Sequence, residues 1–385
     1  MDYGIALHHG LEGIPANAWN ELLAQQATWS PFMRHEYLDA MHASASACDD
    51  TGWTPQYVTL WAGDELAAAA PLYIKHHSYG EYVFDWAWAN AYQQHGLDYY
   101  PKGLVAIPFT PVPGPRLMAR CEQARKALIE ALLATAQNQN LSSLHILFAT
   151  ENELQACQEA GMMRRQTVQF HWEDDAPPAT FEDFLSSLRQ AKRKKIRQER
   201  RKVEEAGVRF SVHEGSEITE TDWAFFYRCY RQTYLEHGNP PYLSPDFFER
   251  MRTTMPENWV LFIADIDGER VAASLIAIDP VNRVAYGRYW GSLAAISCLH
   301  FEACYYQPLQ WCMGNGYKRF EGGAQGEHKM ARALMPVMTG SAHWLAHPAF
   351  ADAVERFLER EGEGVDMYLE ALQKRSPMRE RHIGD

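Results

Sequence analysis

The chain contains 385 residues, of which 46% are hydrophobic and 12% aromatic. This length favours two domains, with three as the alternative, because it exceeds what one ordinary hydrophobic core needs. The apolar content argues against a disordered chain. The formal net charge of −13 argues against a protein that coats nucleic acid, so duplex DNA is not an expected partner. No stretch approaches the ~18 uninterrupted apolar residues of a membrane helix, and no membrane span is expected.

The cysteine and histidine patterns limit the redox and metal chemistry. The seven cysteines are odd in number and never spaced as C-x-x-C, which favours neither a disulfide framework nor a structural zinc site. His343 and His347 are four residues apart, but they lack a carboxylate or cysteine partner, so we expect no metal site. Residues 1–10 contain no long apolar run, so no signal peptide is visible. These features predict a cytoplasmic protein.

The first half of the chain reads as alternating short strands and one long helix. Gly63-Asp64 forms a turn between two apolar runs, which predicts a β-hairpin. The predicted elements, in order, are strands over 57–62, 65–74, 82–88 and 103–107, a turn-rich segment over 108–116, a helix over 121–137 and a strand over 144–148.

A polar, proline-containing stretch over 173–178 predicts a linker between the halves. Thr180 and Asp183 then have the spacing of a helix cap. Between Arg189 and Lys202 lie nine Lys or Arg and one Glu, a charge of +8 that leaves −21 on the rest of the chain. We expect an exposed basic helix over about 181–206 that attracts an anionic ligand to one place.

The second half repeats the order of the first. Asp267-Gly268 predicts a hairpin turn, and aligning Gly63 with Gly268 gives an offset of 205 residues. The predicted elements are strands over 259–266, 269–278 and 283–290, a helix over 297–313 and a strand over 317–321. This order is typical of an acetyltransferase-like unit. We therefore predict an α/β fold with mixed sheets, built from two tandem units over 1–175 and 176–385.

Candidate chemistry in the second half begins where the third strand leads into the helix. Backbone N–H groups and the positive end of a helix favour anions at such a place, so Arg288 and Tyr289 are candidate substrate contacts. His300 and Glu302 fall in the first helical turn, where either is a candidate proton acceptor. The alternatives are a core histidine and an acid that complements the helix dipole. Pro308 predicts a bend in this helix.

The densest polar segment, residues 320–329, follows the last strand. Three glycines within five residues allow close approach of a ligand, and ionisable side chains surround them. A solvated loop is the alternative interpretation. The candidates are His328 and Lys329 as catalytic residues, and Glu321, Gln325 and Arg332 as substrate contacts.

The first half offers two further candidate regions. The loop over 108–116 contains four prolines, and its Arg116 is a candidate clamp for a phosphate or carboxylate, unless the loop is a rigid spacer. Upstream, charged and aromatic residues mix as they do in a binding cleft, or as on an ordinary Tyr-rich strand surface. The candidate substrate contacts there are Glu81, Tyr82, Tyr100 and Lys102.

Several of these motifs resemble one family. The segments that carry the resemblance are 80–86, 99–102, 108–117, 287–291, 299–307 and 320–329. They look like the FemAB-like family of predicted peptidoglycan-biosynthesis N-acyltransferases, over about residues 29–361. The layout is also similar to the Fem aminoacyltransferases, which have two GNAT-fold units and transfer amino acids from aminoacyl-tRNA to the amine of a cell-wall precursor.

The resemblance implies roles for individual residues. Gly114-Pro115 resembles the Gly-Pro of the first-unit loop, and Glu302 matches an acidic position on the second-unit helix. Glu321-Gly322-Gly323 resembles an Asp-x-Gly-Gly strand end with Glu in place of Asp, and Lys329 matches a lysine near the reaction centre. The basic run 192–202 resembles a Lys/Arg helix that opens the second unit. The acetyl-CoA signature R/Q-x-x-G-x-G is absent, and the long helical arm of some Fem enzymes is not evident.

The sequence thus predicts an N-acyltransferase in which an amine attacks an ester or thioester donor, either acyl-CoA or aminoacyl-tRNA, without a tightly bound cofactor. Glu302 or His328 would remove the proton, and Lys329 or Arg332 would steady negative charge. The expected donor-phosphate contacts are Lys192, Arg193, Lys195 and Arg197. The alternatives are a catalytically silent relative that binds an anionic cell-wall precursor, and a module that binds an RNA end.

Overall fold

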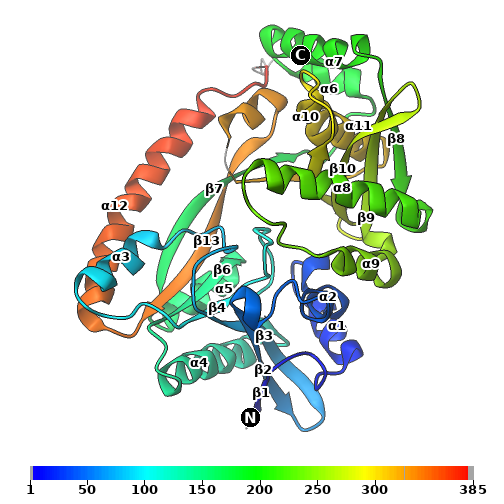
Figure 1. Cartoon of the computed structure of the whole chain (residues 1–385). Coiled ribbons are helices and arrows are strands. Elements are labelled where there is room, and N and C mark those ends of the chain that lie inside the picture. The colour runs from blue at the N-terminus through cyan, green and yellow to red at the C-terminus, as the bar shows by residue number, and fades with distance from the viewer. Residues whose placement is uncertain (1–2, 325, 380–385) are drawn as a thin grey trace. The chain divides into compact units, whose positions relative to one another are not determined.

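The computed structural model of the chain describes residues 3–324 and 326–379 (Figure 1). Contacts divide the chain into two units, each made of several stretches. Unit 1 contains the residues up to 167, together with Tyr242–Phe247 and Met338–Met367, and unit 2 contains the remainder. The predicted boundary after residue 175 lies close to the first crossing, whereas the two later stretches group with unit 1. Within the described residues, no helix has the length and apolar character needed to cross a membrane.

Unit 1 is built on a sheet with the strand order β1-β2-β3-β4-β6-β13. β4 runs parallel to β6, and the other neighbours on this path are antiparallel. The elements that lie wholly in this unit are β1 (Gly4–His8), α1 (Ala16–Ala24), α2 (His35–Ala43), β2 (Trp53–Ala62), β3 (Glu65–Lys75), α3 (Trp86–Gln94), β4 (Lys102–Val105), β5 (Met118–Ala119), α4 (Glu122–Asn138), β6 (Ser143–Ala149) and α5 (Glu151–Glu159).

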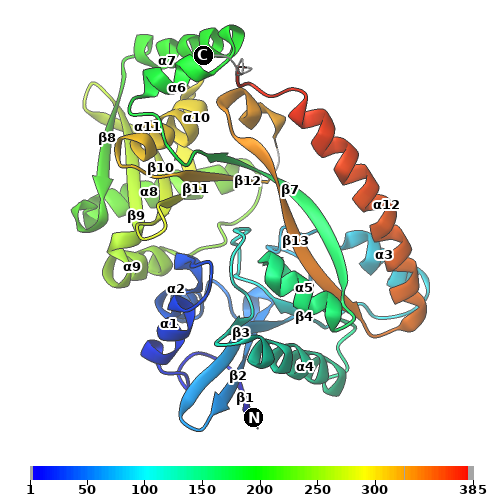
Figure 2. The same cartoon turned by 180° about the vertical axis from the view of Figure 1, so that it is seen from behind.

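Strand pleating sends alternate side chains of this sheet to opposite faces. Val58 and Leu72 pack in one core with Leu128 of α4. On the other face, the ring of Tyr57 packs against the ring of Trp19 of α1, with 5.6 Å between the ring centres. The sheet therefore lies between α1 and α2 on one side and α4 on the other (Figure 2).

Unit 2 repeats this plan with the strand order β7-β12-β11-β10-β9-β8. β11 runs parallel to β12, and the remaining neighbours are antiparallel. The elements that lie wholly in this unit are α6 (Phe181–Ser187), α7 (Gln190–Glu205), β8 (Val208–Glu214), α8 (Glu220–Glu236), β9 (Trp259–Ile266), β10 (Glu269–Asp279), β11 (Val284–Ser292), α10 (Leu299–Phe301), a π-helical turn (Glu302–Tyr306), α11 (Gln307–Gly314), β12 (Arg319–Ala324) and a short 3-10 segment (Glu327–Arg332). α8 covers one face of the sheet, and α10 and α11 cover the other (Figures 1 and 2).

The chain passes from one unit to the other within four elements: β7 (Met163–Glu173), α9 (Pro245–Thr254), β13 (Met335–Leu345) and α12 (Pro348–Gln373). The later part of β7 pairs with β12, and the later part of β13 pairs with β6. Each half of the chain therefore supplies a strand to the sheet of the other unit. The sequence did not predict this exchange.

The predicted fold class is confirmed, because the order of elements around the hairpin β2–β3 recurs around β9–β10. One first-half prediction is wrong: residues 82–88 form no strand, and α3 begins at Trp86 instead. In the structure Glu81 and Asp85 turn inward to bind the ammonium group of Lys102, and Tyr82 has a positive φ of 64°.

The predicted basic helix is also corrected, because it is two helices with a break between them. The chain is extended at Leu188, with φ −89° and ψ 157°. Leu188 is fully buried and forms a β-bridge with Met378, while the backbone N–H of Arg189 donates to the Pro377 carbonyl at 2.9 Å. This pairing with a distant segment of unit 2 ends α6 and separates it from α7.

The predicted helix over 297–313 is interrupted as its proline suggested. α10 ends at Phe301, a π-helical turn follows over Glu302–Tyr306, and Pro308 lies in the first turn of α11. Proline cannot donate the backbone hydrogen bond of a helix interior, so a restart just before it leaves no missing donor. Single π-turns of this kind occur often at functional sites.

Candidate functional site

The sheet of unit 2 opens between β11 and β12. The two strands pair in parallel only from Val284 to Tyr286, opposite Arg319–Glu321, although β11 continues along β10 to Ser292. At the end of the shared stretch β11 carries a bulge that makes Arg288 the extra residue. Bulges re-aim side chains and are frequent beside active sites. The opening lies at the strand end for which the sequence predicted ligand contacts.

Lys329 is fixed at the end of β12. Its Nζ donates to the carbonyl oxygens of Gly322 at 2.7 Å and Ala324 at 2.8 Å, with the Gly323 oxygen farther away at 3.4 Å. The third contact is long, so one N–H of the ammonium group remains for a ligand. Burial lowers the pKa of Lys329 to about 8.

Two histidines lie in the electrostatic field of this lysine. Burial, followed by the charges of His328, Arg332 and Lys329, lowers the pKa of His300 to about 4. Burial and the charges of Arg332, Lys329 and Lys195 lower the pKa of His328. The Nε2 atom of His328 is 3.4 Å from the Tyr305 hydroxyl. Both imidazoles are therefore neutral at pH 7 and able to accept a proton.

Glu302 is held by donors on two sides. Arg200 of α7 places its Nε at 3.1 and 3.2 Å from the two carboxylate oxygens, and the Gln307 amide donates to Oε1 at 2.7 Å. The guanidinium of Arg200 also lies over the Phe181 ring, 4.5 Å from its centre. These contacts fasten α7 to the π-helical turn and cover the carboxylate that the sequence offered as a general base.

A second ion pair joins α7 to the segment behind β12. Arg332 donates from Nη2 to Glu199 at 2.8 Å and from Nη1 to the His328 carbonyl at 2.6 Å. Its guanidinium lies 3.6 Å from the centre of the Phe301 ring, and the Tyr306 hydroxyl also binds Glu199. Arg332 is only 1% exposed, so it positions its neighbours, and its side chain is not presented at the surface.

The remaining second-half candidates form a separate group. Phe320 packs in the core with Leu309, so Glu321, the next residue along the strand, points to the opposite face of the sheet. There the Nε atom of Arg319 is 3.2 Å from the Glu321 carboxylate, and burial raises the pKa of Glu321 to about 7. Arg288 donates to the Tyr289 hydroxyl at 3.1 Å. Glu302 and Glu321 therefore do not meet.

The cations of α7 differ in accessibility. Ile196, Glu199 and Val203 form its buried stripe. Lys195 is adjacent to this stripe, its side chain is 58% exposed, and its Nζ is 4.0 Å from Glu199. The other predicted phosphate contacts lie on the same helix: Lys192 and Arg193 are half-buried, and Arg197 is exposed and pairs with Glu182.

Unit 1 contains a buried charge cluster around Lys102. Its ammonium group donates to Glu81 at 2.7 Å and to Ser78 at 2.8 Å, and it also binds Asp85. Lys102 is fully buried, and both acids are more than nine-tenths buried. The half-buried Tyr100 reaches this cluster through Ser78, whose Oγ is 2.9 Å from its hydroxyl. Three of the four upstream candidates thus meet.

A hydrogen-bonded chain extends from this cluster into the sheet. The Tyr99 hydroxyl donates to Asp85 at 2.6 Å and lies 3.1 Å from Nε2 of His145. The Nδ1 atom of His145 is 2.8 Å from that of His343, which is opposite it on β13. Burial lowers the pKa of His145 to about 3, so this ring stays neutral inside the sheet.

Three other residues that the sequence suggested as substrate contacts lie elsewhere. Tyr82 is 37% exposed, in the loop before α3. Arg116 is fully buried and donates to the carbonyl oxygens of Val112 at 2.6 Å and Pro115 at 3.2 Å, so it braces its own loop and is not a ligand clamp. Gln325 lies outside the described residues.

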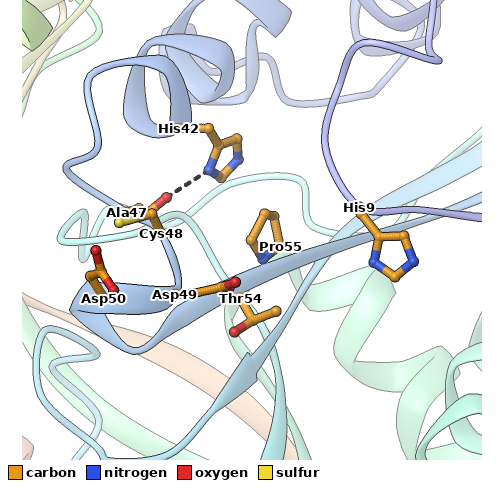
Figure 3. A pocket seen from close by; sticks show the side chains of 8 residues that line it. All are labelled: His9, His42, Ala47, Cys48, Asp49, Asp50, Thr54 and Pro55. Atoms are coloured by element: carbon orange, nitrogen blue, oxygen red, sulfur yellow. Dashed lines mark hydrogen bonds between the residues drawn. The ribbon is translucent and has the colours of Figure 1, made fainter.

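A surface pocket of about 560 Å³ in unit 1 contains none of the predicted residues (Figure 3). His42 lines it, but one ring nitrogen lies 2.9 Å from the Ala47 carbonyl and the other 2.8 Å from the Tyr57 hydroxyl. Both nitrogens of this ring are therefore engaged inside the protein. The pocket supplies no cluster comparable to those around Lys102 and Lys329.

Sequence reasoning missed Glu199 and Arg200, as well as Asp85, His145 and His343 as members of the Lys102 cluster. A signal existed for Glu199: it is the single acid of the basic run, and it falls on the helical stripe of Ile196 and Val203. His145 and His343 gave no such signal. Each lies within a buried strand, and the two side chains meet only because of the strand exchange.

Comparisons with solved structures identify the fold. FemX matches with a TM-score of 0.55 and 11% identity, over 91% of this chain and all of that chain. The C-terminal domain of a putative lysylphosphatidylglycerol synthetase from Agrobacterium fabrum matches with a TM-score of 0.54 and 11% identity, over 90% and 95% of the two chains. L-PGS from Bacillus licheniformis has a TM-score of 0.54 and 11% identity, over 91% and 99%.

At such identities these likenesses establish the fold alone. A search of curated proteins found no match. The family model named FemAB-like, described as peptidoglycan biosynthesis/recognition, matches residues 10–380. That match covers nearly the whole chain, and the protein therefore belongs to the FemAB-like family.

Proposed function

We propose that this protein is an N-acyltransferase that moves an acyl or aminoacyl group from an activated donor to a substrate amine. The reaction centre is the opening between β11 and β12. The observation that carries the proposal is the group of Lys329, His300 and His328 beside that opening. It joins a fixed cation to two neutral imidazoles, which suits a reaction that creates an oxyanion and releases a proton.

In the proposed reaction the amine nitrogen attacks the donor carbonyl, and a C–N bond forms as the carbonyl electrons move onto oxygen. The ammonium group of Lys329 stabilises that oxyanion. His328 accepts the proton of the attacking amine. When the intermediate collapses, the C–O bond of an ester or the C–S bond of a thioester breaks, and the leaving oxygen or sulfur takes the proton from His328.

Glu302 has a positioning role in this scheme. Arg200 and Gln307 donate to its carboxylate, so it holds α7 against the π-helical turn that carries Tyr305, the partner of His328. Arg332 acts in the same way through Glu199. Of the two residues that the sequence indicated for proton removal, Glu302 and His328, we therefore assign the role of general base to His328.

The donor is assigned to a molecule that carries phosphates, either acyl-CoA or aminoacyl-tRNA. Lys192, Arg193 and Lys195 of α7 are its expected contacts. The hydrogen bonds of Arg200 to Glu302 and of Arg332 to Glu199 join that helix to the segments around the reaction centre, which supports this assignment. The family description favours the amine of a cell-wall precursor as the acceptor. The reaction as written needs no tightly bound cofactor.

The test is intact-mass analysis of candidate amines incubated with the protein and either an acyl-CoA pool or an aminoacyl-tRNA pool. We expect a mass increase of one acyl group with one of the two donors, and its loss in Lys329→Met and His328→Gln. Asn239→Asp, an exposed change in unit 2, is the control for effects of mutagenesis and purification. Binding of an anionic precursor without any acylation would identify a catalytically silent relative and contradict the proposal.

A further inference from the structure

The segment between β3 and α3 in unit 1 turns its acids inward and its aromatic rings outward. Glu81 and Asp85 are 4% and 3% exposed, whereas Tyr79 is 61% exposed and Trp86 37%. The two rings lie 5.2 Å apart. We call residues 76–86 the aromatic–acid loop. Exposed large apolar side chains that gather in one short segment mark binding surfaces.

The acids of this loop are only half used by the protein. Lys102 binds Oε2 of Glu81 and Oδ2 of Asp85, and with Ser78 these acceptors take all three N–H groups of its ammonium. The other carboxylate oxygens, Oε1 of Glu81 and Oδ1 of Asp85, are buried and accept no hydrogen bond from any residue in 3–324 or 326–379. Both carboxylates thus retain an acceptor beside the same ammonium group.

Two carboxylates share the one ammonium group of Lys102. Burial raises the pKa of Glu81 to about 7, so the second carboxylate is only partly charged at neutral pH. The nearby Lys75 directs its Nζ toward the Trp53 ring at 3.8 Å and the Tyr79 carbonyl at 3.3 Å. Burial lowers the pKa of Lys75 to about 7, so much of this lysine is uncharged at neutral pH. A further cation would relieve the cost of burying carboxylate oxygens without donors.

We infer that the aromatic–acid loop binds the ammonium group of a primary amine, with Glu81 and Asp85 as acceptors and the rings of Tyr79 and Trp86 beside the carbon chain. An ammonium group offers three donors and is attracted to aromatic faces, which matches both halves of the loop. Tyr100, half-buried and bonded to Ser78, marks the surface end of the cluster.

A metal ion fits this loop less well than an amine. In the two described stretches of the chain, no group of three or more His, Cys, Asp or Glu side chains is placed to hold a metal. The inference does not rest on the proposed function, because the aromatic–acid loop lies in unit 1 and binding of an amine needs no donor.

The experiment is calorimetric titration of the full chain with n-pentylamine at pH 7.5, without any donor. 1-Pentanol has the same carbon chain without the charge, and Mg²⁺ is a cation without the chain. We expect saturable binding of pentylamine and at least about tenfold weaker binding of pentanol, since the alcohol cannot form charge-assisted hydrogen bonds. Equal binding of amine and alcohol, or displacement of the amine by millimolar Mg²⁺, overturns the inference.

Variants locate the site. Glu81→Gln and Asp85→Asn keep an acceptor for Lys102 but remove the carboxylate charge, so each should weaken pentylamine binding about tenfold or more. Glu65→Gln, an exposed change on β3, is the matched control and should bind as the parent does. If the buried changes unfold unit 1, Trp86→Leu at the surface replaces them, with an expected weakening of severalfold. Unchanged binding in a folded variant contradicts the inference, even if acylation proceeds.

Discussion

Glu302 is a candidate general base by residue type, but Arg200 and Gln307 donate to its carboxylate, which supports a positioning role. Arg200→Leu would leave the Glu302 carboxylate with the Gln307 amide as its hydrogen-bond donor. The free energy of unfolding should fall by about 1–3 kcal/mol. Solvent screening moderates this loss, because the Arg200 side chain is 28% exposed. Glu302→Gln retains an acceptor and should cost less. Urea denaturation and acyl-transfer rates measure both variants. A stable Glu302→Gln that loses all transfer would return the role of general base to Glu302.

The buried carboxyl group of Glu321 should make the stability of the protein depend on pH. Its folded pKa, raised by burial to about 7, exceeds the ordinary value of 4.5, so between these values the folded state binds the extra proton. The contribution of this group to stability is fully present below pH 4.5 and is lost as the pH rises through 7. Glu321→Gln should therefore flatten the fall in stability between pH 4.5 and 7. Denaturant midpoints at half-unit pH intervals measure it, and parallel curves for parent and variant would contradict it.

At the scale of elements, the close approach at the end of β12 requires glycine. A Cβ added to Gly322 would lie 2.3 Å from Leu334 and 2.9 Å from the backbone oxygen of Phe170, and the latter cannot rotate away. Gly322→Ala should lower the free energy of unfolding by about 1–3 kcal/mol and disturb the carbonyls that hold Lys329.

Gly314, at the end of α11, is the control for that substitution, because an added Cβ there meets nothing within 4 Å. Gly314→Ala should stabilise the protein slightly, by up to about 1 kcal/mol, through helix propensity. Thermal unfolding of both variants provides the comparison. Equal stability of the two would mean that the strand end is not tightly packed.

The elements also show which sequence signals were informative. Both hairpins followed from glycine-containing turns between apolar runs, and Pro308 indicated the interruption before α11, because these signals act over a few residues. The break at Leu188 and the absence of a strand at 82–88 depend on partners that are distant in the sequence, Met378 and Lys102. No local pattern encodes such a partner.

For the molecule as a whole, duplication was visible but strand exchange was not. The 205-residue offset between Gly63 and Gly268 predicted two similar units. The sequences of β7 and β13 do not indicate which sheet each strand joins. Either strand could pair in an antiparallel manner with the last strand of either unit's sheet. The pair of His145 and His343 exists only through that exchange, and it was missed for this reason. The structure brings candidate residues together where they lie close in sequence, as in the run that ends at Lys329.

Charge distribution at this scale yields a prediction for the donor. The run from Arg189 to Lys202 carries +8 and the rest of the chain −21, so an anionic donor should be attracted to α7 and repelled elsewhere. If the donor is aminoacyl-tRNA, replacing Lys192, Arg193 and Lys195 with Gln removes three phosphate contacts. The slope of log affinity against log salt concentration should then flatten by about 2, as for single-stranded nucleic acid.

The control makes the same change in net charge away from α7, by replacing the exposed Lys126, Arg356 and Lys374 with Gln. If attraction to α7 is local, this control keeps the salt slope of the parent, whereas a response to net charge alone alters both triple variants equally. Filter binding of aminoacyl-tRNA between 50 and 300 mM salt, conditions on the order of those where such slopes are linear, separates the outcomes. Equal slopes in all three proteins would exclude α7 as the donor contact, because released counterions report the phosphates that a protein neutralises.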